Sequence, residues 1–381
     1  MNKVYTGQKI FTGKSILNNF RMEVEDGFIT SLIGDQNDVD SGYVIPGIID
    51  SHCHLMLPED KHVYDNHRGQ SQAVLSGYGH AFEMLKGGVV ACRDLGSKYG
   101  YVLGIKDIID QKVLIGPKII SAGQSISVTG GHGFEMSLEC DGKDEISKGV
   151  KIVIKEGADL VKLMASGGVN SPGEEPGPPE LTLEELKIAT DTAHAFGRKV
   201  SVHAHGYTAM KRAIEAGVDS IEHGVYLEED LMNQMIEKDI YLVPTFSAPY
   251  YAVKEGLKRD PNHSDHNESK LVLERHRKAV LKAYRKGVKV AFGTDAGTPF
   301  NPYDDVLYEL VLMVEAGFTE AEAITCGTVN SADLLDLKHM GELKVGKEAN
   351  FIVLENDPLE DIRVVMTSKK IYLKGELIEG D

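Results

Sequence analysis

Two histidines separated by one residue, His52 and His54, end an apolar stretch that begins at Val44. Side chains of a β-strand alternate between its two faces, so both imidazoles would point the same way while Cys53 points to the opposite face. Neutral imidazole is a common ligand of divalent metal ions. The pair therefore indicates a metal site at the end of a strand, with Cys53 as a packing residue.

Four further polar residues follow short, strand-like apolar runs later in the chain, and they are, in order, Lys162, His203, His223 and Asp295. Binding and catalytic groups of parallel α/β proteins gather at the carboxyl ends of the strands. We therefore expect these residues and the two histidines to line one site. Alternatively, Asp295 could belong to an ordinary strand-to-helix turn and have no role in binding.

From residue 71 to residue 297, short β-like runs alternate with amphipathic segments, which is the pattern of βα units around a parallel sheet. Eight such strands predict an α/β fold of the (β/α)8 TIM-barrel type, which takes about 250 residues. The candidate strands are Gly47–His52, Val89–Asp94, Lys118–Ser121, Asp159–Lys162, Lys199–His203, Ser220–His223, Tyr241–Pro244 and Val288–Gly293.

The two ends of the chain differ from this pattern. Residues 1–44 and 343–381 alternate apolar and polar residues over short turns, and neither piece is large enough to bury a core alone. We predict that residues 1–45 and 345–381 together form one small β-sandwich-like domain. Residues 46–344 would then form the barrel.

Two segments are predicted to be loops. Residues 166–179 are rich in Gly and Pro and follow Lys162, so they should lie over the barrel mouth, where such loops often act as lids. Residues 246–267 are polar and follow the seventh strand. Their His263 and His266 could bind a metal, but ordinary solvated histidines are the favoured interpretation.

Composition narrows the class of protein. The chain has 381 residues, 42% of them hydrophobic, and a formal net charge of −17, which argues against nucleic acid or an anionic membrane as a partner. The four cysteines form no C-x-x-C pair, as expected in a reducing compartment. No secretory signal and no run of about 18 apolar residues is visible, so a cytoplasmic location is expected.

The ordered polar residues make this chain resemble the amidohydrolase superfamily. That family carries H-x-H on barrel strand 1, Lys on strand 4, His on strands 5 and 6, and Asp on strand 8. The tail Gly341–Leu354 looks like the family's return to its small β domain. Residues 129–133, 202–206 and 222–226 resemble the metal-dependent prolidase and Xaa-Arg/Lys carboxypeptidase branch, which is related to imidazolonepropionases.

The resemblance implies two divalent metal ions. His52, His54 and Asp295 would hold the more buried ion, while His203 and His223 would hold the more exposed one. Nitrogen and carboxylate ligands suit zinc, which is the expected metal, although manganese or iron could substitute. His205 shares the strand face of His203, and the sequence leaves its role open.

Lys162 is the unusual member of the set, because an ammonium group is a cation and cannot ligate a metal. The resemblance implies that the neutral amine adds carbon dioxide and becomes N6-carboxylysine, whose carbamate bridges both ions. The residues alone show only a lysine at a strand end. A rim lysine paired with a carboxylate is the alternative.

Asp295, His132 and Tyr226 are the expected catalytic residues. Asp295 would take a proton from the water held between the metals and pass it to the leaving amine. In the branch that this chain resembles, the residues at the positions of His132 and Tyr226 polarise the scissile carbonyl. An ordinary loop histidine and a packing tyrosine are the alternatives.

The expected function is a binuclear metal-dependent amidohydrolase that uses metal-bridged hydroxide on a dipeptide or N-acyl amino acid, with C-terminal Pro, Arg or Lys favoured. Hydrolysis of a cyclic amide, a urea or a phosphotriester is the alternative. Deaminases of the family that this chain resembles usually carry a Glu shortly after the strand 5 histidine. No Glu follows His203 closely, so deamination is disfavoured. A non-catalytic scaffold is disfavoured because all six ligand positions are filled. The resemblance also implies a homo-oligomer.

Overall fold

The computed structural model describes residues 2–57, 67–168, 177–259 and 265–380. Strands and helices alternate through most of the chain, and no helix in these ranges is long and apolar enough to cross a membrane. The helices are α1 His67–Gly87, α2 Val102–Asp110, α3 Gly142–Glu156, α4 Leu183–Ala195, α5 Tyr207–Ala216, α6 Glu229–Glu237, α7 Ser247–Arg259, α8 Asp265–Lys286, α9 Tyr308–Ala316, α10 Glu320–Thr325 and α11 Ser331–Leu334.

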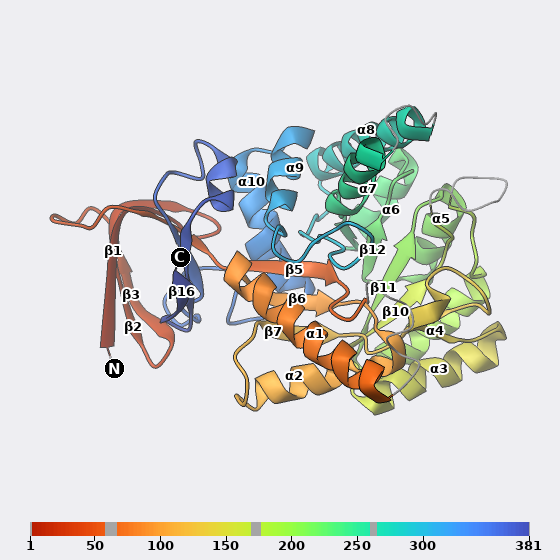
Figure 1. Ribbon diagram of the computed structural model, residues 1–381. Coiled ribbons are helices and arrows are strands. Elements are labelled where there is room, and N and C mark those ends of the chain that lie inside the picture. The colour runs from red at the N-terminus through yellow and green to blue at the C-terminus, as the bar shows by residue number, and fades with distance from the viewer. Residues whose placement is uncertain (1, 58–66, 169–176, 260–264, 381) are drawn as a thin grey trace.

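Both ends of the chain contribute to one seven-stranded sheet, ordered β16-β15-β14-β4-β1-β2-β3 and lying apart from the helices (Figure 1). A separate hydrophobic cluster, which includes Ile10, Phe20, Val44 and Phe351, packs within this region. The sandwich-like packing of the sheet stays a prediction. Its strands are β1 Asn2–Phe11, β2 Ile16–Glu25, β3 Phe28–Ile33, β4 Tyr43–Pro46, β14 Phe351–Leu354, β15 Lys369–Leu373 and β16 Glu376–Gly380.

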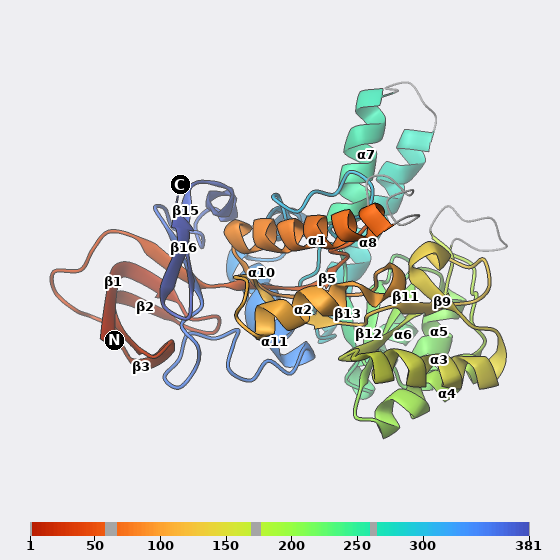
Figure 2. The ribbon, with the colours of Figure 1, turned by 60° about the horizontal axis from the view of Figure 1, so that its bottom comes forward.

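The middle of the chain forms two parallel sheets, ordered β5-β6-β7 and β13-β12-β11-β10-β8-β9, which confirms the α/β class with parallel strands. The helices surround these strands in Figures 1 and 2. The strands are β5 Ile48–Cys53, β6 Val89–Asp94, β7 Lys118–Ser121, β8 Ser125–Ser127, β9 Ser137–Glu139, β10 Leu160–Met164, β11 Lys199–Ala204, β12 Ser220–His223 and β13 Tyr241–Val243.

Every residue of β5, β6, β10 and β12 is buried, as expected for strands covered on both faces. Charged or polar residues inside such strands therefore need a specific partner or a function. His52 and Glu222 are two of these residues, and Arg93 and Lys162 are two more.

Seven of the eight expected barrel strands are present with bounds shifted by two residues at most. The eighth expectation, Val288–Gly293, was wrong in detail, because this segment forms only an isolated bridge between Val290 and Leu242. Its backbone still forms hydrogen bonds with Leu242 and Ser51. Gly293 packs closely between these neighbours, since a Cβ there would come 2.4 Å from Val243 Cγ1 and 2.9 Å from His52 Cβ. The short strands β8 and β9 were not predicted.

The loop predicted for residues 246–267 was also wrong, because α7 and the start of α8 occupy most of it. These two helices pack together and rise from the body of the molecule in Figure 2. A tertiary contact helps to begin α7, since Glu309 accepts hydrogen bonds from the backbone of Phe246 and Ser247 (2.8 and 2.6 Å). His263 lies outside the described residues, as does the side chain of His266.

Candidate metal centre

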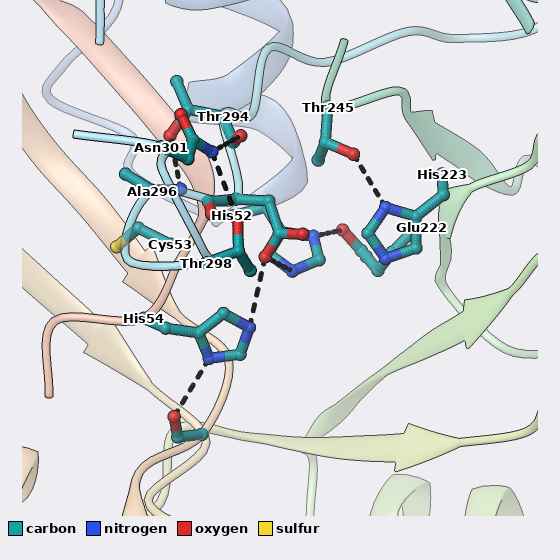
Figure 3. A network of polar contacts seen from close by, with 12 residues as sticks. His52, Cys53, His54, Glu222, His223, Thr245, Thr294, Ala296, Thr298 and Asn301 are labelled. Carbon is teal, nitrogen blue, oxygen red and sulfur yellow. Dashed lines mark hydrogen bonds and ion pairs between the residues drawn. The ribbon is translucent and has the colours of Figure 1, made fainter. Parts of the chain in front are cut away.

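His52, His54 and Asp295 meet at the carboxyl end of β5. Figure 3 shows the two histidines there. Asp295 Oδ1 lies 3.2 Å from His52 Nε2 and 3.3 Å from His54 Nε2, and all three residues are buried. Cys53 turns its thiol away, toward the carbonyl oxygen of Arg93 at 3.6 Å. The strand alternation expected for this segment thus brings both imidazoles to one point.

Hydrogen bonds at the far side of each ring determine the tautomer. His52 Nδ1 lies 2.9 Å from a carboxylate oxygen of Glu222, and His54 Nδ1 lies 3.0 Å from the carbonyl oxygen of Gly96. Both partners only accept, so each Nδ1 carries a proton, and Nε2 is the ring atom directed at Asp295.

Three atoms able to bind a metal ion therefore converge. In the described part of the chain, no hydrogen-bond donor satisfies Asp295 Oδ1. Burial alone would raise the pKa of Asp295, but interactions with His52 and His54 outweigh it and lower the pKa well below the usual range. An ionised carboxylate beside two imidazole nitrogens fits a divalent cation.

A second group of candidate ligands consists of His203, His205 and His223, whose ligand atoms all lie within 4.8 Å of one another. His223 Nδ1 lies 2.7 Å from Thr245 Oγ1, and His203 Nε2 is buried without a partner among the described residues. Burial, followed by the neighbouring histidines, lowers the pKa of all three, in His205 to about 3. The rings are therefore neutral at pH 7 and able to bind metal.

Left-handed backbone at strand ends positions part of the site. His223, Thr245 and Asp295 have φ values of 71°, 55° and 59°. Such values are uncommon for residues other than glycine, and for a β-branched threonine they indicate strain. Because of this turn, the consecutive residues Glu222 and His223 both reach His52, through the Nδ1 contact and through rings 5.1 Å apart.

Lys162 is the third of five residues in β10, not the last as expected, and its side chain is fully buried. Burial lowers the pKa of its amine to about 8, although Glu222 and Asp295 act in the opposite direction and Arg93 adds to the lowering. The neutral form of this amine is thus far more populated near pH 7 than that of an exposed lysine.

His132 lies beside the second group, with its ring stacked on His203 at a centroid distance of 4.3 Å. Its backbone N–H donates to Glu180 at 2.8 Å, and burial lowers its pKa. The backbone N–H of Tyr226 donates to the carbonyl oxygen of His205 at 3.1 Å. The structure therefore brings both predicted catalytic residues to the second histidine group.

The Gly/Pro-rich loop contacts the site at its far end. Gly177 has a φ of +65°, and a Cβ placed there would come 2.6 Å from His205 Cβ, so only glycine permits this approach. Residues 169–176 of the loop lie outside the described residues.

Sequence reasoning missed Glu222 and Arg93, which lie behind His52. Arg93 donates to Glu222 Oε1 at 2.8 Å, and both side chains are fully buried. Burial would raise the pKa of Glu222, but Arg93 and then His52 outweigh it and lower the pKa well below its usual range. A charged residue within each of two apolar, strand-like runs was the available signal.

Several known proteins are similar to this chain in sequence or in structure. Residues 43–378 match the sequence pattern of the Amidohydrolase family. Ochratoxinase from Aspergillus niger is 29% identical over 99% of this chain and 86% of that protein. An imidazolonepropionase from Deinococcus radiodurans is 25% identical over 51% of this chain and 45% of that protein. A solved Xaa-Pro dipeptidase with methionine in its active site has a TM-score of 0.88 and 30% identity, with both chains covered completely.

Proposed function

This chain belongs to the amidohydrolase family and is a hydrolase acting on C–N bonds, and on that premise we propose that it cleaves dipeptides or N-acyl amino acids. The proposal favours Pro, Arg or Lys on the C-terminal side of the amide bond. It is supported by the similarity, over the whole chain, to a protein described as a Xaa-Pro dipeptidase.

One observation carries the proposal. Nε2 of His52, Nε2 of His54 and the ionised carboxylate of Asp295 converge on one buried point. Two imidazole nitrogens and a carboxylate oxygen are ligand atoms that a divalent cation prefers. This convergence supports a metal site at these three residues.

We assign one divalent ion to His52, His54 and Asp295 and a second to His203 and His223, with zinc as the expected metal. When bound, two such ions supply hydroxide near neutral pH and polarise a carbonyl group. N6-carboxylysine at Lys162 would complete the ligand set as a bridge, and the buried amine with its lowered pKa supports that assignment.

The remaining steps belong to protein side chains. Asp295 accepts the proton of the attacking water and later gives it to the departing amine. The side chains of His132 and Tyr226 hold the carbonyl oxygen as negative charge develops on it. His132 is neutral at pH 7, since burial lowers its pKa, and a neutral imidazole can still donate from one nitrogen.

We expect His132→Asn and Tyr226→Phe each to lower kcat by about 10²- to 10³-fold, the usual cost of one oxyanion donor. Metal content should stay unchanged, because neither residue is assigned as a ligand. Steady-state kinetics and elemental analysis of the same preparations test this. A loss of metal in either variant would contradict the assignment.

The same proposal treats the two parallel sheets as one closed (β/α)8 barrel of residues 46–344, beside a small domain of residues 1–45 and 345–381. Closure is supported by hydrogen bonds from Asp159 N to Ser121 O (2.7 Å) and from Ser51 N to Phe292 O (2.9 Å). Four free, buried cysteines and the charge of −17 are consistent with a cytoplasmic protein without nucleic-acid partners. Family resemblance alone supports a homo-oligomer.

The activity is tested by release of free amino acids from a library of dipeptides and N-acyl amino acids, with zinc-loaded protein against a chelated control. We expect zinc-dependent release that is concentrated on particular C-terminal residues. No release from the library, with two ions bound, would contradict the proposal. The search would then move to cyclic amides, ureas and phosphotriesters.

A further inference from the structure

A buried network of charged and polar side chains lies behind His52, on the side away from Asp295. Glu222 on β12 is at its centre and has no exposed surface. Its Oε1 accepts three hydrogen bonds, from Arg93 Nη2 (2.8 Å), Ser201 Oγ (2.7 Å) and Ser220 Oγ (2.6 Å). These donors come from β6, β11 and β12, so three strands hold one oxygen atom.

The second oxygen of Glu222 is directed at a metal ligand. Oε2 lies 2.9 Å from His52 Nδ1, a contact drawn in Figure 3. Because Oε1 is held by three donors, the carboxylate cannot rotate to a different partner without breaking them. Arg93 is held in turn, since its guanidinium also donates to Ser51 O and to Ser220 Oγ.

His52 and His54 differ in the acceptor that their Nδ1 atoms contact. His54 Nδ1 donates to a neutral backbone carbonyl, that of Gly96, whereas His52 Nδ1 donates to a charged carboxylate. Hydrogen bonds to ionised acceptors are roughly twice as strong as neutral ones. A carboxylate behind a ligating histidine also fixes the ring and makes its other nitrogen a better donor of electrons.

The geometry points to Glu222, held by Arg93, Ser201 and Ser220, as the positioning residue that presents His52 Nε2 to the ion shared with His54 and Asp295. This inference rests on the proposed two-metal function. It assigns Glu222 to one of the two ions, because the hydrogen bonds of its carboxylate among the described residues include His52 but none of His203, His205 and His223.

The test compares Glu222→Gln in two backgrounds that each keep one ligand group. The His203→Asn background keeps the ligand group of His52, His54 and Asp295 intact. The His54→Asn background keeps the group of His203, His205 and His223 intact. Zinc affinity is measured by competition with a chelator, without substrate. We expect E222Q to weaken zinc binding about 10- to 100-fold in the His203→Asn background, and less than about 3-fold in the other.

Glu309→Gln is the matched control. Glu309 is another fully buried acidic side chain, whose pKa burial raises to about 8, and it accepts hydrogen bonds from Phe246 and Ser247. The Glu309→Gln substitution should leave the zinc affinity unchanged in both backgrounds. If E222Q does not fold, as judged by circular dichroism, Ser220→Ala removes one donor from Oε1 and should weaken only the His52 group.

Equal losses at both ligand groups, together with a lower Tm of the metal-free protein, would show a merely structural role and overturn the inference. Unchanged zinc affinity in both backgrounds would overturn it as well. Because zinc binding is measured apart from turnover, these outcomes differ from a failure of the proposed function, which would appear as a wild-type protein that releases no amino acid.

Discussion

Asp295→Asn is expected to lower kcat by about 10²- to 10⁴-fold, the range for loss of a general acid–base group. The asparagine keeps the shape and one oxygen ligand but cannot take up a proton. It also removes the negative charge that faces His52 and His54, at 3.2 and 3.3 Å, so zinc affinity should fall at the same time. Single-turnover kinetics at saturating zinc separates the two effects.

Asp304→Asn provides the control for this prediction. It makes the same chemical change in the same strand-to-helix connection, but Asp304 is exposed. Its kcat should match that of the wild type. An Asp295→Asn protein that turns over at the wild-type rate with both ions bound would remove Asp295 from the chemistry.

Lys162→Ala is expected to lower kcat at least about 10³-fold, because a metal contributes several kcal/mol of transition-state stabilisation and the bridging ligand is lost. Elemental analysis should find fewer than two ions per chain. A short carboxylic acid such as propionate should restore part of the activity, since it can occupy the space of the missing carbamate.

Carboxylation of Lys162 also predicts a pH dependence. Only the neutral amine adds carbon dioxide, and the pKa of about 8 means that the neutral fraction rises as the pH rises through 8. Protein stripped of metal and carbon dioxide should therefore regain activity faster as the pH rises, at fixed dissolved carbon dioxide and zinc, and the rate should level off only well above pH 8.

Lys199→Ala is the control, because Lys199 begins the neighbouring strand β11 and forms an ion pair with Asp336 at 2.8 Å. It should keep two ions and full turnover. Full turnover and two ions in Lys162→Ala would instead show that Lys162 is a buried lysine without a bridging role.

Much of the fold was readable because its signals are local. Short apolar runs predicted the parallel strands. The error over residues 246–267 has a local explanation. Few described positions of α7 are buried, among them Ser247 and Tyr251, so the segment looked like a polar loop.

The candidate site, like the fold, was predictable from the sequence only in part. The strand period alone places His52 and His54 on one face, and chain order places Asp295 at the end of a later strand-like segment. The same alternation would send Glu222 and His223 to opposite faces. The left-handed φ of 71° at His223 breaks it, and that value depends on packing around the site.

The sequence by itself determined the class of fold, the family resemblance and the residues able to hold a metal, because each follows from residue type and short-range spacing. Only the tertiary structure decided which atoms converge. Glu222 meets His52 across 170 residues, and His205 joins His203 and His223 in one group. Such contacts depend on how strands far apart in the chain pack side by side, which no local pattern specifies.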